Sequence, residues 1–486
     1  MWKFWLPRTA DSTASSEPDK PGDSRNDIQE SQLGVADVLF ILGLVSAFFT
    51  GYLRDHYGGI ISYGLTDGLL GVAFFLAIVN WGPRKFFAQT PLTTPLMLLL
   101  VLSVPSAFNP EAHALEGLLG LRAWNFYNLV FFYTYLRVQN QRAIHRLVTL
   151  LLVIGVLVAA YGMYQLWIGP EKFVEGSRLI EERHKYEAYS IFPEEDVQIY
   201  VFRPFSTLHS AGGLGSAMFG LSLLAMSFAL REGRGRAWRV PIGLAVFVLF
   251  GAMLLLTGSR ASVLAYVLGT LTFVALQRRV SRALLIVLLA VVALYGAVDI
   301  SAGAILGRLE TLNPAGAIGT AESNWQTVML KRIQNNMGWV VGMMNNPLGL
   351  GVGTTGVGIP TLPGVERWGF RGTLVDSDLG RAAVEMGIPG FLVVGYLVGA
   401  MVFHAARIGN RLRNSPFEAL ASSLAGIVVG SLPLILLGSP LYGPPISFLI
   451  WSSLGALLKL EILANRRRVP AHRLTPPTES YARTIE

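Results

Sequence analysis

The chain has 486 residues, of which 52% are hydrophobic and only 14% are charged, and it contains no cysteine. Soluble domains carry about 25% charged residues, so this composition excludes an ordinary soluble protein. The lack of cysteine excludes disulfides, a thiolate nucleophile and cysteine-ligated metal centres. The net charge of +8 does not indicate a nucleic-acid partner, because many basic residues lie in short segments between apolar runs.

The two ends of the chain are polar. Residues 1–34 are rich in Ser, Asp and Pro, and they lack the basic segment joined to an apolar core that a secretory signal needs. We therefore expect a disordered cytoplasmic tail over 1–34 and a basic cytoplasmic tail over 464–486. The transmembrane domain is expected over 35–463.

Apolar runs of about 20 residues predict an all-α, polytopic membrane protein with about twelve transmembrane helices. In chain order the expected spans lie at 35–53, 60–81, 91–108, 117–136, 147–168, 211–230, 240–257, 261–277, 283–300, 379–404, 417–438 and 443–463.

Every second junction between these spans is basic, and the short junctions between them are poor in Lys and Arg. The positive-inside rule therefore places both termini in the cytoplasm. Two long loops, 169–210 and 301–378, fall on the outer side, and we expect the larger one to be partly helical. The basic residues of the inner junctions are Arg84, Lys85, Arg137, Arg142, Arg146, Arg231, Arg234, Arg236, Arg239, Arg278, Arg279, Arg282, Arg407, Arg411 and Arg413.

Three polar clusters are predicted at the outer interface. The first is 203–210, with Arg203 and His209; the second is the Thr-Gly-Ser-Arg turn at 257–260; the third is 375–385. Charged groups at membrane depth are costly, and they mark functional sites by default. The common depth of the three clusters predicts one site.

The residue types in these clusters suit group transfer from a phosphorylated donor. Two arginines match phosphate oxygens, since each guanidinium offers a planar fork of donors and stays charged. A nearby carboxylate is able to take a proton from a sugar hydroxyl. Arginine against a diphosphate stabilises the charge that develops as the diphosphate leaves.

The order of the motifs resembles the O-antigen ligase and polymerase superfamily. The motifs are Arg-Pro-Phe-Ser-Thr-Leu-His at 203–209, Thr-Gly-Ser-Arg at 257–260, Asn-Pro-Leu-Gly-Leu-Gly-Val-Gly at 346–353 and Gly-Ile-Pro-Gly at 387–390, with Leu-Arg-Ala-Trp-Asn-Phe-Tyr at 121–127. The resemblance covers roughly residues 35–460. It implies a GT-C-like membrane glycosyltransferase at the periplasmic face of the bacterial inner membrane. Such enzymes use an undecaprenyl-diphosphate-linked oligosaccharide donor, need no metal or other cofactor, and invert the anomeric centre.

The resemblance implies that Arg203 and Arg260 bind the diphosphate. The family commonly has a His-Asn pair eleven residues before the glycine that corresponds to Gly387, and here Asp376-Ser377 stands there. The role of catalytic base would therefore fall on Asp376 or on neighbouring Asp378.

Further residues are candidates for substrate binding, each with a structural alternative. Arginines near the interface also snorkel to headgroups, and the pair four residues apart at the start of the tenth span also suits a structural ion pair. The candidates are Arg122, His209, Ser259, Arg381 and Glu385.

The acceptor is a second lipid-linked glycan for a polymerase, or a lipid A core for a ligase. The aspartate at the usual histidine position favours a polymerase. The alternative class is a transporter or flippase for a lipid-linked glycan, because twelve spans also suit paired six-span halves. The predicted clustering of charge at the outer interface, and the lack of similarity between the halves, favour transfer.

Overall fold

The computed structural model describes residues 34–57, 59–110, 114–138, 141–168, 189–194, 197–231, 236–277, 338–356, 375 and 377–468. Residues 1–33 and 469–486 of the expected tails lie outside these ranges. So do the ninth expected span, at 283–300, and most of the larger outer loop.

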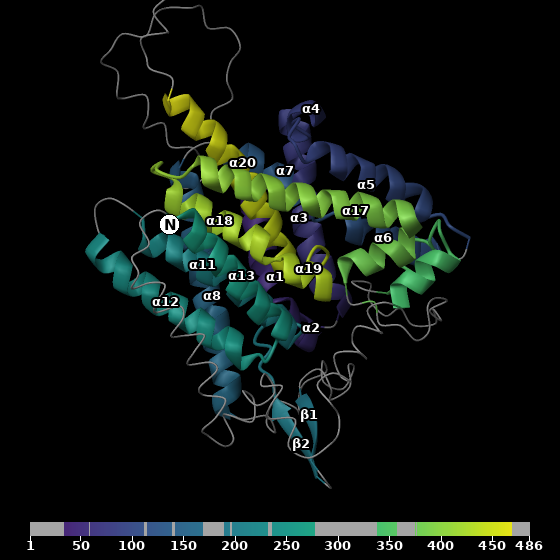
Figure 1. Cartoon of the computed structure of the whole chain (residues 1–486), viewed down its shortest axis with the longest axis horizontal. Helices are drawn as coiled ribbons and strands as arrows, with labels where there is room; N and C mark the ends of the chain where they lie inside the picture. The colour runs from purple at the N-terminus through teal and green to yellow at the C-terminus, as the bar shows by residue number, and fades with distance from the viewer. Residues whose placement is uncertain are drawn as a thin grey trace, which may run out of the picture.

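Most of the described chain is helical (Figure 1). Its N-terminal half contains α1 (Val35–Phe48), α2 (Thr50–Tyr57), α3 (Gly59–Trp81), α4 (Pro83–Phe86), α5 (Thr93–Ser106), α6 (Ala114–Asn125), α7 (Leu129–Arg137) and α8 (Gln141–Ile168). The later part contains α11 (Ala211–Ala229), α12 (Arg236–Leu256), α13 (Arg260–Leu276), α17 (Asp378–Arg411), α18 (Glu418–Gly430), α19 (Leu432–Leu437) and α20 (Ile446–Arg468).

The expected all-α membrane architecture is confirmed at the level of composition and helix length. Seven of the described helical segments are long and apolar enough to cross a membrane, or eight if the α1–α2 pair, bent by 75°, is one span. α5 and α13 are apolar but shorter. The total of twelve spans and the GT-C arrangement stay predictions.

Two features differ from the expected outline. The expected outer loop 169–210 contains an antiparallel hairpin of β1 (Tyr189–Glu194) and β2 (Val197–Phe202), with Tyr189 opposite Phe202. Figure 1 shows this hairpin projecting from the helical body. At the other end of the chain, α20 continues to Arg468, so the last helix extends into the expected C-terminal tail.

The fourth expected span, 117–136, is two helices rather than one. α6 ends at Asn125, whose side-chain amide donates to Ser103 Oγ at 2.9 Å and to the Leu121 carbonyl at 3.1 Å. The Asn128 amide donates to the Trp124 carbonyl at 2.9 Å. Asparagine side chains that bond to nearby backbone offer an alternative to the helical ladder, which explains the break.

The bundle has a buried centre and an apolar rim. α11, α13 and α18 pack against one another, and α20 packs on α18 and on α7 (Figure 1). The peripheral α3 leaves Phe75 and Val79 exposed, at 66% and 62%. Large apolar side chains exposed along a helix are what contact with lipid requires.

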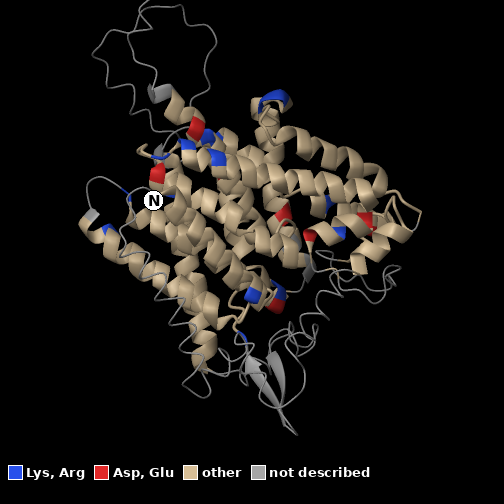
Figure 2. Cartoon of the chain, viewed as in Figure 1, with Lys and Arg blue, Asp and Glu red and all other residues tan. Residues whose placement is uncertain are grey.

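The bundle has two ends, and the end that is rich in Lys and Arg is called the basic end below. At the basic end, Arg137 at the end of α7 pairs with Asp37 at the start of α1, and Arg411 near the end of α17 pairs with Glu461 of α20 at 2.6 Å. Figure 2 shows Lys and Arg gathered around α4 and the ends of α17 and α20, while most of the helical body is uncharged. The opposite end, where α12 turns into α13, is called the loop end below.

Candidate functional site

The first and second predicted clusters meet at the loop end. Arg203, just after β2, donates a hydrogen bond from Nε to the Thr257 carbonyl at 2.8 Å. Thr257 is fully buried at the end of α12, where its hydroxyl donates to the Leu254 carbonyl at 2.6 Å. The segment 203–210 and the Thr-Gly-Ser-Arg turn are therefore in direct contact.

The bend between α1 and α2 makes room for segment 203–210. The Thr207 hydroxyl donates to the Phe48 carbonyl at 2.6 Å, and the Tyr52 amide donates to the Thr207 carbonyl at 3.0 Å. A Cβ at Gly51 would lie 2.1 Å from the Leu208 carbonyl, so the backbones touch here. Only glycine permits this approach.

A buried glutamine fixes the segment from the other side. Gln165 of α8 donates to the Ser206 carbonyl at 3.1 Å and accepts from the Ser206 amide at 2.7 Å. Ser206 has a φ of 55°, in the left-handed region. Sequence analysis missed Gln165, and the signal was a lone amide inside an apolar run.

The Thr-Gly-Ser-Arg turn places Arg260 as the first residue of α13, where its side chain is exposed. Gly258 provides the tight reversal with a φ of 64°. Ser259 hydrogen-bonds Ser262 at 2.8 Å between hydroxyl oxygens, which ties the turn into the first turn of α13. His209 is half-buried and directly precedes Ser210, the N-cap of α11.

The third cluster lies at the start of α17. Ser377 is the N-cap, and its hydroxyl accepts from the Gly380 amide at 2.9 Å. Asp378, Arg381 and Glu385 follow, all fully buried. Asp376 lies outside the described residues.

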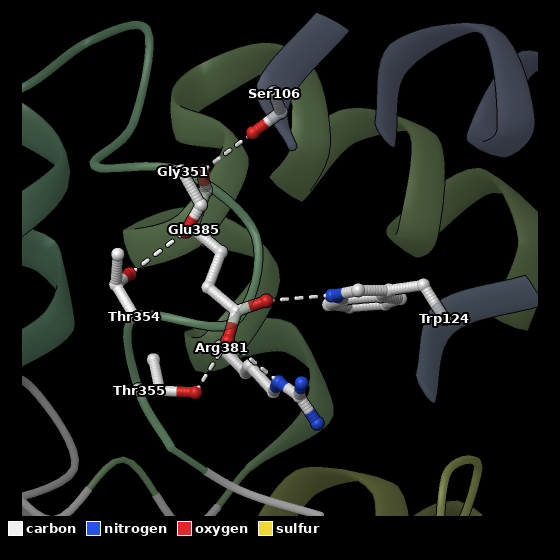
Figure 3. Close-up of polar contacts among 7 residues, drawn as sticks. All are labelled: Ser106, Trp124, Gly351, Thr354, Thr355, Arg381 and Glu385. Atoms are coloured by element: carbon white, nitrogen blue, oxygen red, sulfur yellow. Dashed lines mark hydrogen bonds and ion pairs between the residues drawn. The ribbon is translucent and has the colours of Figure 1, made fainter. Parts of the chain in front are cut away.

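Arg381 and Glu385 form the i,i+4 ion pair that their spacing suggested, with 2.9 Å between Nε and Oε1. Figure 3 shows two further donors on the Glu385 carboxylate: Trp124 Nε1 at 2.6 Å from Oε2, and the Thr355 hydroxyl at 2.5 Å from Oε1. A buried carboxylate needs such partners, because removing it from water is costly. Neither Trp124, which was named only within the motif at 121–127, nor Thr355 was among the predicted site residues.

A break in α17 docks the glycine-rich segment, residues 346–356. Gly387 has a φ of 66°, and Pro389 lacks the amide that would bond the Glu385 carbonyl. The freed carbonyls of Val384 and Glu385 accept from the Leu350 and Gly351 amides, each at 2.9 Å. The Ile388 amide in turn donates to the Pro347 carbonyl at 2.9 Å.

The end of α5 also contacts α17 and the glycine-rich segment. The Ser106 hydroxyl of α5 donates to the Glu385 carbonyl at 3.0 Å (Figure 3), and the Asn109 amide donates to the Gly349 carbonyl at 3.1 Å. α5, α17 and segment 347–353 are thereby joined at the loop end.

Asp378 contacts the connection between α19 and α20. Its Oδ2 accepts from the Leu441 amide at 3.2 Å, and its own amide donates to the Gly438 carbonyl at 3.1 Å. The Tyr442 ring lies in this connection, 4.3 Å from the Arg381 guanidinium. Burial raises the pKa of Tyr442 well above its ordinary value, so the ring stays neutral and attracts the cation through its face.

Arg122 has partners within the protein. It forms an ion pair with Asp67 of α3 and donates to the Tyr127 hydroxyl at 2.7 Å. Tyr127 also donates to Asp67, at 3.0 Å. The charge of Arg122 is thus balanced by α3, and its role toward a lipid diphosphate stays a prediction.

Within the described ranges, no three His, Asp or Glu side chains are grouped so that they could hold a metal ion. No family model matches the chain, and a search of curated proteins finds no significant match. The order of the motifs and the geometry at the loop end are therefore what supports a functional proposal.

Proposed function

We propose that this protein is a membrane glycosyltransferase of the O-antigen polymerase or ligase type, acting from an undecaprenyl-diphosphate-linked oligosaccharide. The observation that carries the proposal is the contact of Arg203 with the Thr257 carbonyl, beside the turn that presents Arg260. Two arginines held at one end of an apolar bundle suit a lipid diphosphate, whose tail stays in the bilayer.

The proposed reaction is a displacement at the anomeric carbon of the donor. The acceptor hydroxyl gives its proton to a carboxylate, and its oxygen forms the new glycosidic bond. The bond between the anomeric carbon and the diphosphate oxygen breaks, and the lipid diphosphate leaves with the electron pair. Arg203 and Arg260 would stabilise the charge on the leaving group, which is where a fixed donor contributes most.

Asp378 and Asp376 are the proposed bases. Asp378 is buried at the first turn of α17, with an oxygen directed to the Leu441 amide. Asp376 is two residues earlier in the chain and belongs to the part that the structure leaves undescribed. Ser259 and His209, next to the two arginine segments, are proposed to line the donor site.

The proposed setting is the bacterial inner membrane, with the basic end in the cytoplasm and the loop end in the periplasm. The difference in basic residues between the two ends supports this orientation. The acceptor is proposed to be a second lipid-linked glycan, with a lipid A core as the alternative. A transporter is the second candidate class, favoured only by the number of spans expected from sequence.

The test uses purified protein in detergent, a defined undecaprenyl-diphosphate oligosaccharide, and EDTA, with products separated by size. A ladder of longer lipid-linked glycans would indicate a metal-independent polymerase. Transfer only after addition of a lipid A core would indicate a ligase. An intact donor with no diphosphate lipid released in either reaction would contradict the proposal and favour transport.

Arg260→Ala and Arg260→Lys test the arginine in the same assay. Both are expected to lose most transfer, because an ammonium is a point charge and does not replace the fork of guanidinium donors. Arg413→Lys is the matched control. It lies at the basic end, where Arg413 donates to the Ala275 carbonyl near the end of the same α13. If Arg260→Ala made product of normal length and in normal amount, the assignment of Arg260 to the donor site would be wrong.

A further inference from the structure

Arg381 carries hydrogen-bond donors that the protein does not use. Its Nε donates to Glu385, but among the described residues Nη1 and Nη2 have no hydrogen-bond partner, although the side chain is fully buried. Figure 3 shows the tip of the guanidinium directed away from the Glu385 carboxylate. Buried donors in native proteins are almost always paired, so the unpaired arginine tip points to a binding role.

An unused acceptor accompanies these donors. Within the part of the chain that the structure describes, Oδ1 of Asp378 also lacks a hydrogen-bond partner, while its Oδ2 accepts from the Leu441 amide and Ser439 also hydrogen-bonds the carboxylate. Asp378 and Arg381 lie one helical turn apart at the start of α17 and interact electrostatically. The cluster therefore presents buried donors next to a buried acceptor.

A hydroxyl group is the chemical complement of this pair. It accepts hydrogen bonds through its oxygen and donates one through its hydrogen, so it offers the acceptor that Arg381 lacks and the donor that Asp378 lacks. A phosphate has acceptors only, so it offers no donor to Asp378, and it would be repelled by Glu385, which lies within the same two turns of helix. A carboxylate is disfavoured in the same way.

The arginine is held rigidly for this role. Glu385 fixes Nε, and Trp124 and Thr355 fix Glu385. The guanidinium lies 4.3 Å from the Tyr442 ring centroid and 5.3 Å from that of Trp124, so aromatic rings hold it in place. Such support gives a polar group a fixed direction, as a binding residue requires.

We propose that Arg381 and Asp378 together hold the attacking hydroxyl of the acceptor glycan, with Arg381 donating to its oxygen and Asp378 accepting its proton. Glu385 and Trp124 are positioning residues that act through Arg381. This inference rests on the proposed glycosyl transfer, and it assigns the acceptor to the α17 cluster and the donor diphosphate to Arg203 and Arg260.

The test measures acceptor binding without turnover. The probes are octyl glycosides of a single repeat unit, together with monodeoxy analogues that each lack one hydroxyl of the terminal sugar. In the wild-type protein, one analogue is expected to bind about ten- to a hundredfold more weakly than the intact glycoside, because it lacks the bonded hydroxyl. In Arg381→Lys and in Asp378→Asn this difference should shrink severalfold, while the Kd for the lipid diphosphate donor stays within about twofold.

The matched control is Arg411→Lys, which alters an exposed arginine of the same helix that also pairs with a glutamate. It should leave the discrimination between glycosides intact. Each variant must elute as a single species of wild-type size, and if Arg381→Lys does not fold, Asp378→Asn decides the question by the same binding readout.

Three outcomes would overturn the inference. A weakened donor Kd in Arg381→Lys would place Arg381 in the diphosphate site. Equal effects of Arg381→Lys on every glycoside, or no effect on any, would leave Arg381 a structural residue. If the wild-type protein transfers no glycan at all, it is the proposed function that fails.

Discussion

The Glu385 carboxylate accepts hydrogen bonds from three side chains, two of which come from distant parts of the chain. Trp124 belongs to α6, Thr355 to the glycine-rich segment and Arg381 to the preceding turn of α17. A single carboxylate thus determines where three elements meet. Since Trp124, Arg381 and Glu385 are buried, the loss of one donor should be measurable as a loss of stability.

Trp124→Phe removes the indole donor to Glu385 and keeps an aromatic ring. Trp451→Phe is the matched control, because Trp451 is equally buried but its Nε1 has no hydrogen-bond partner among the described residues. We expect Trp124→Phe to lower the free energy of unfolding by about 1.5–3 kcal/mol more than the control does, the usual effect of a bond to a charged group. Denaturant unfolding of the purified protein in detergent measures the difference. Equal losses would mean that the bond to Glu385 adds no stability.

At the scale of elements, the break in α17 depends on one glycine. A Cβ at Gly387 would lie 2.1 Å from the Pro347 carbonyl oxygen, and its φ of 66° is strained for any L side chain. Gly387→Ala should therefore destabilise the protein by more than about 2 kcal/mol and should loosen segment 347–353 from the helix.

Gly395 of the same helix is the control for this substitution. No atom of the described residues lies within 4 Å of a Cβ added there, so Gly395→Ala should stabilise α17 by about 0.5–1 kcal/mol through helix propensity. Thermal unfolding and proteolysis should show that Gly387→Ala lowers the stability of the protein and that Gly395→Ala raises it. A similar effect of both variants would show that the break is not held by Gly387.

Local sequence patterns predicted the helices better than the contacts between them. The apolar runs predicted most of the helices, and the turn before Arg260 was expected from residues that favour a tight reversal. The exchange of backbone bonds between 347–351 and α17 was not expected, because it depends on partners brought together only by the fold. For the same reason, Glu385 was seen as half of an ion pair and its bonds to Trp124 and Thr355 were not.

At the scale of the whole molecule, the two ends of the bundle differ in charge. The side of the membrane on which each end lies can be measured by cysteine labelling. The chain has no cysteine, so an introduced one is labelled without background. Gln198→Cys, in the hairpin, should react with a membrane-impermeant maleimide on intact spheroplasts. Lys85→Cys, in α4 at the basic end, should react only after permeabilisation. Reaction of both from the same side would contradict the proposed orientation.

The bonds between α17 and the glycine-rich segment also bear on how the protein is assembled. Unpaired carbonyls within a bilayer are costly, and those of Val384 and Glu385 find their donors in a stretch of chain made earlier. If the loop end is periplasmic, that stretch must cross the membrane before α17 completes its hydrogen bonding. The loop before α17 must then be exported before the last helices can pack. The order in which the segments are synthesised is therefore also the order in which they assemble.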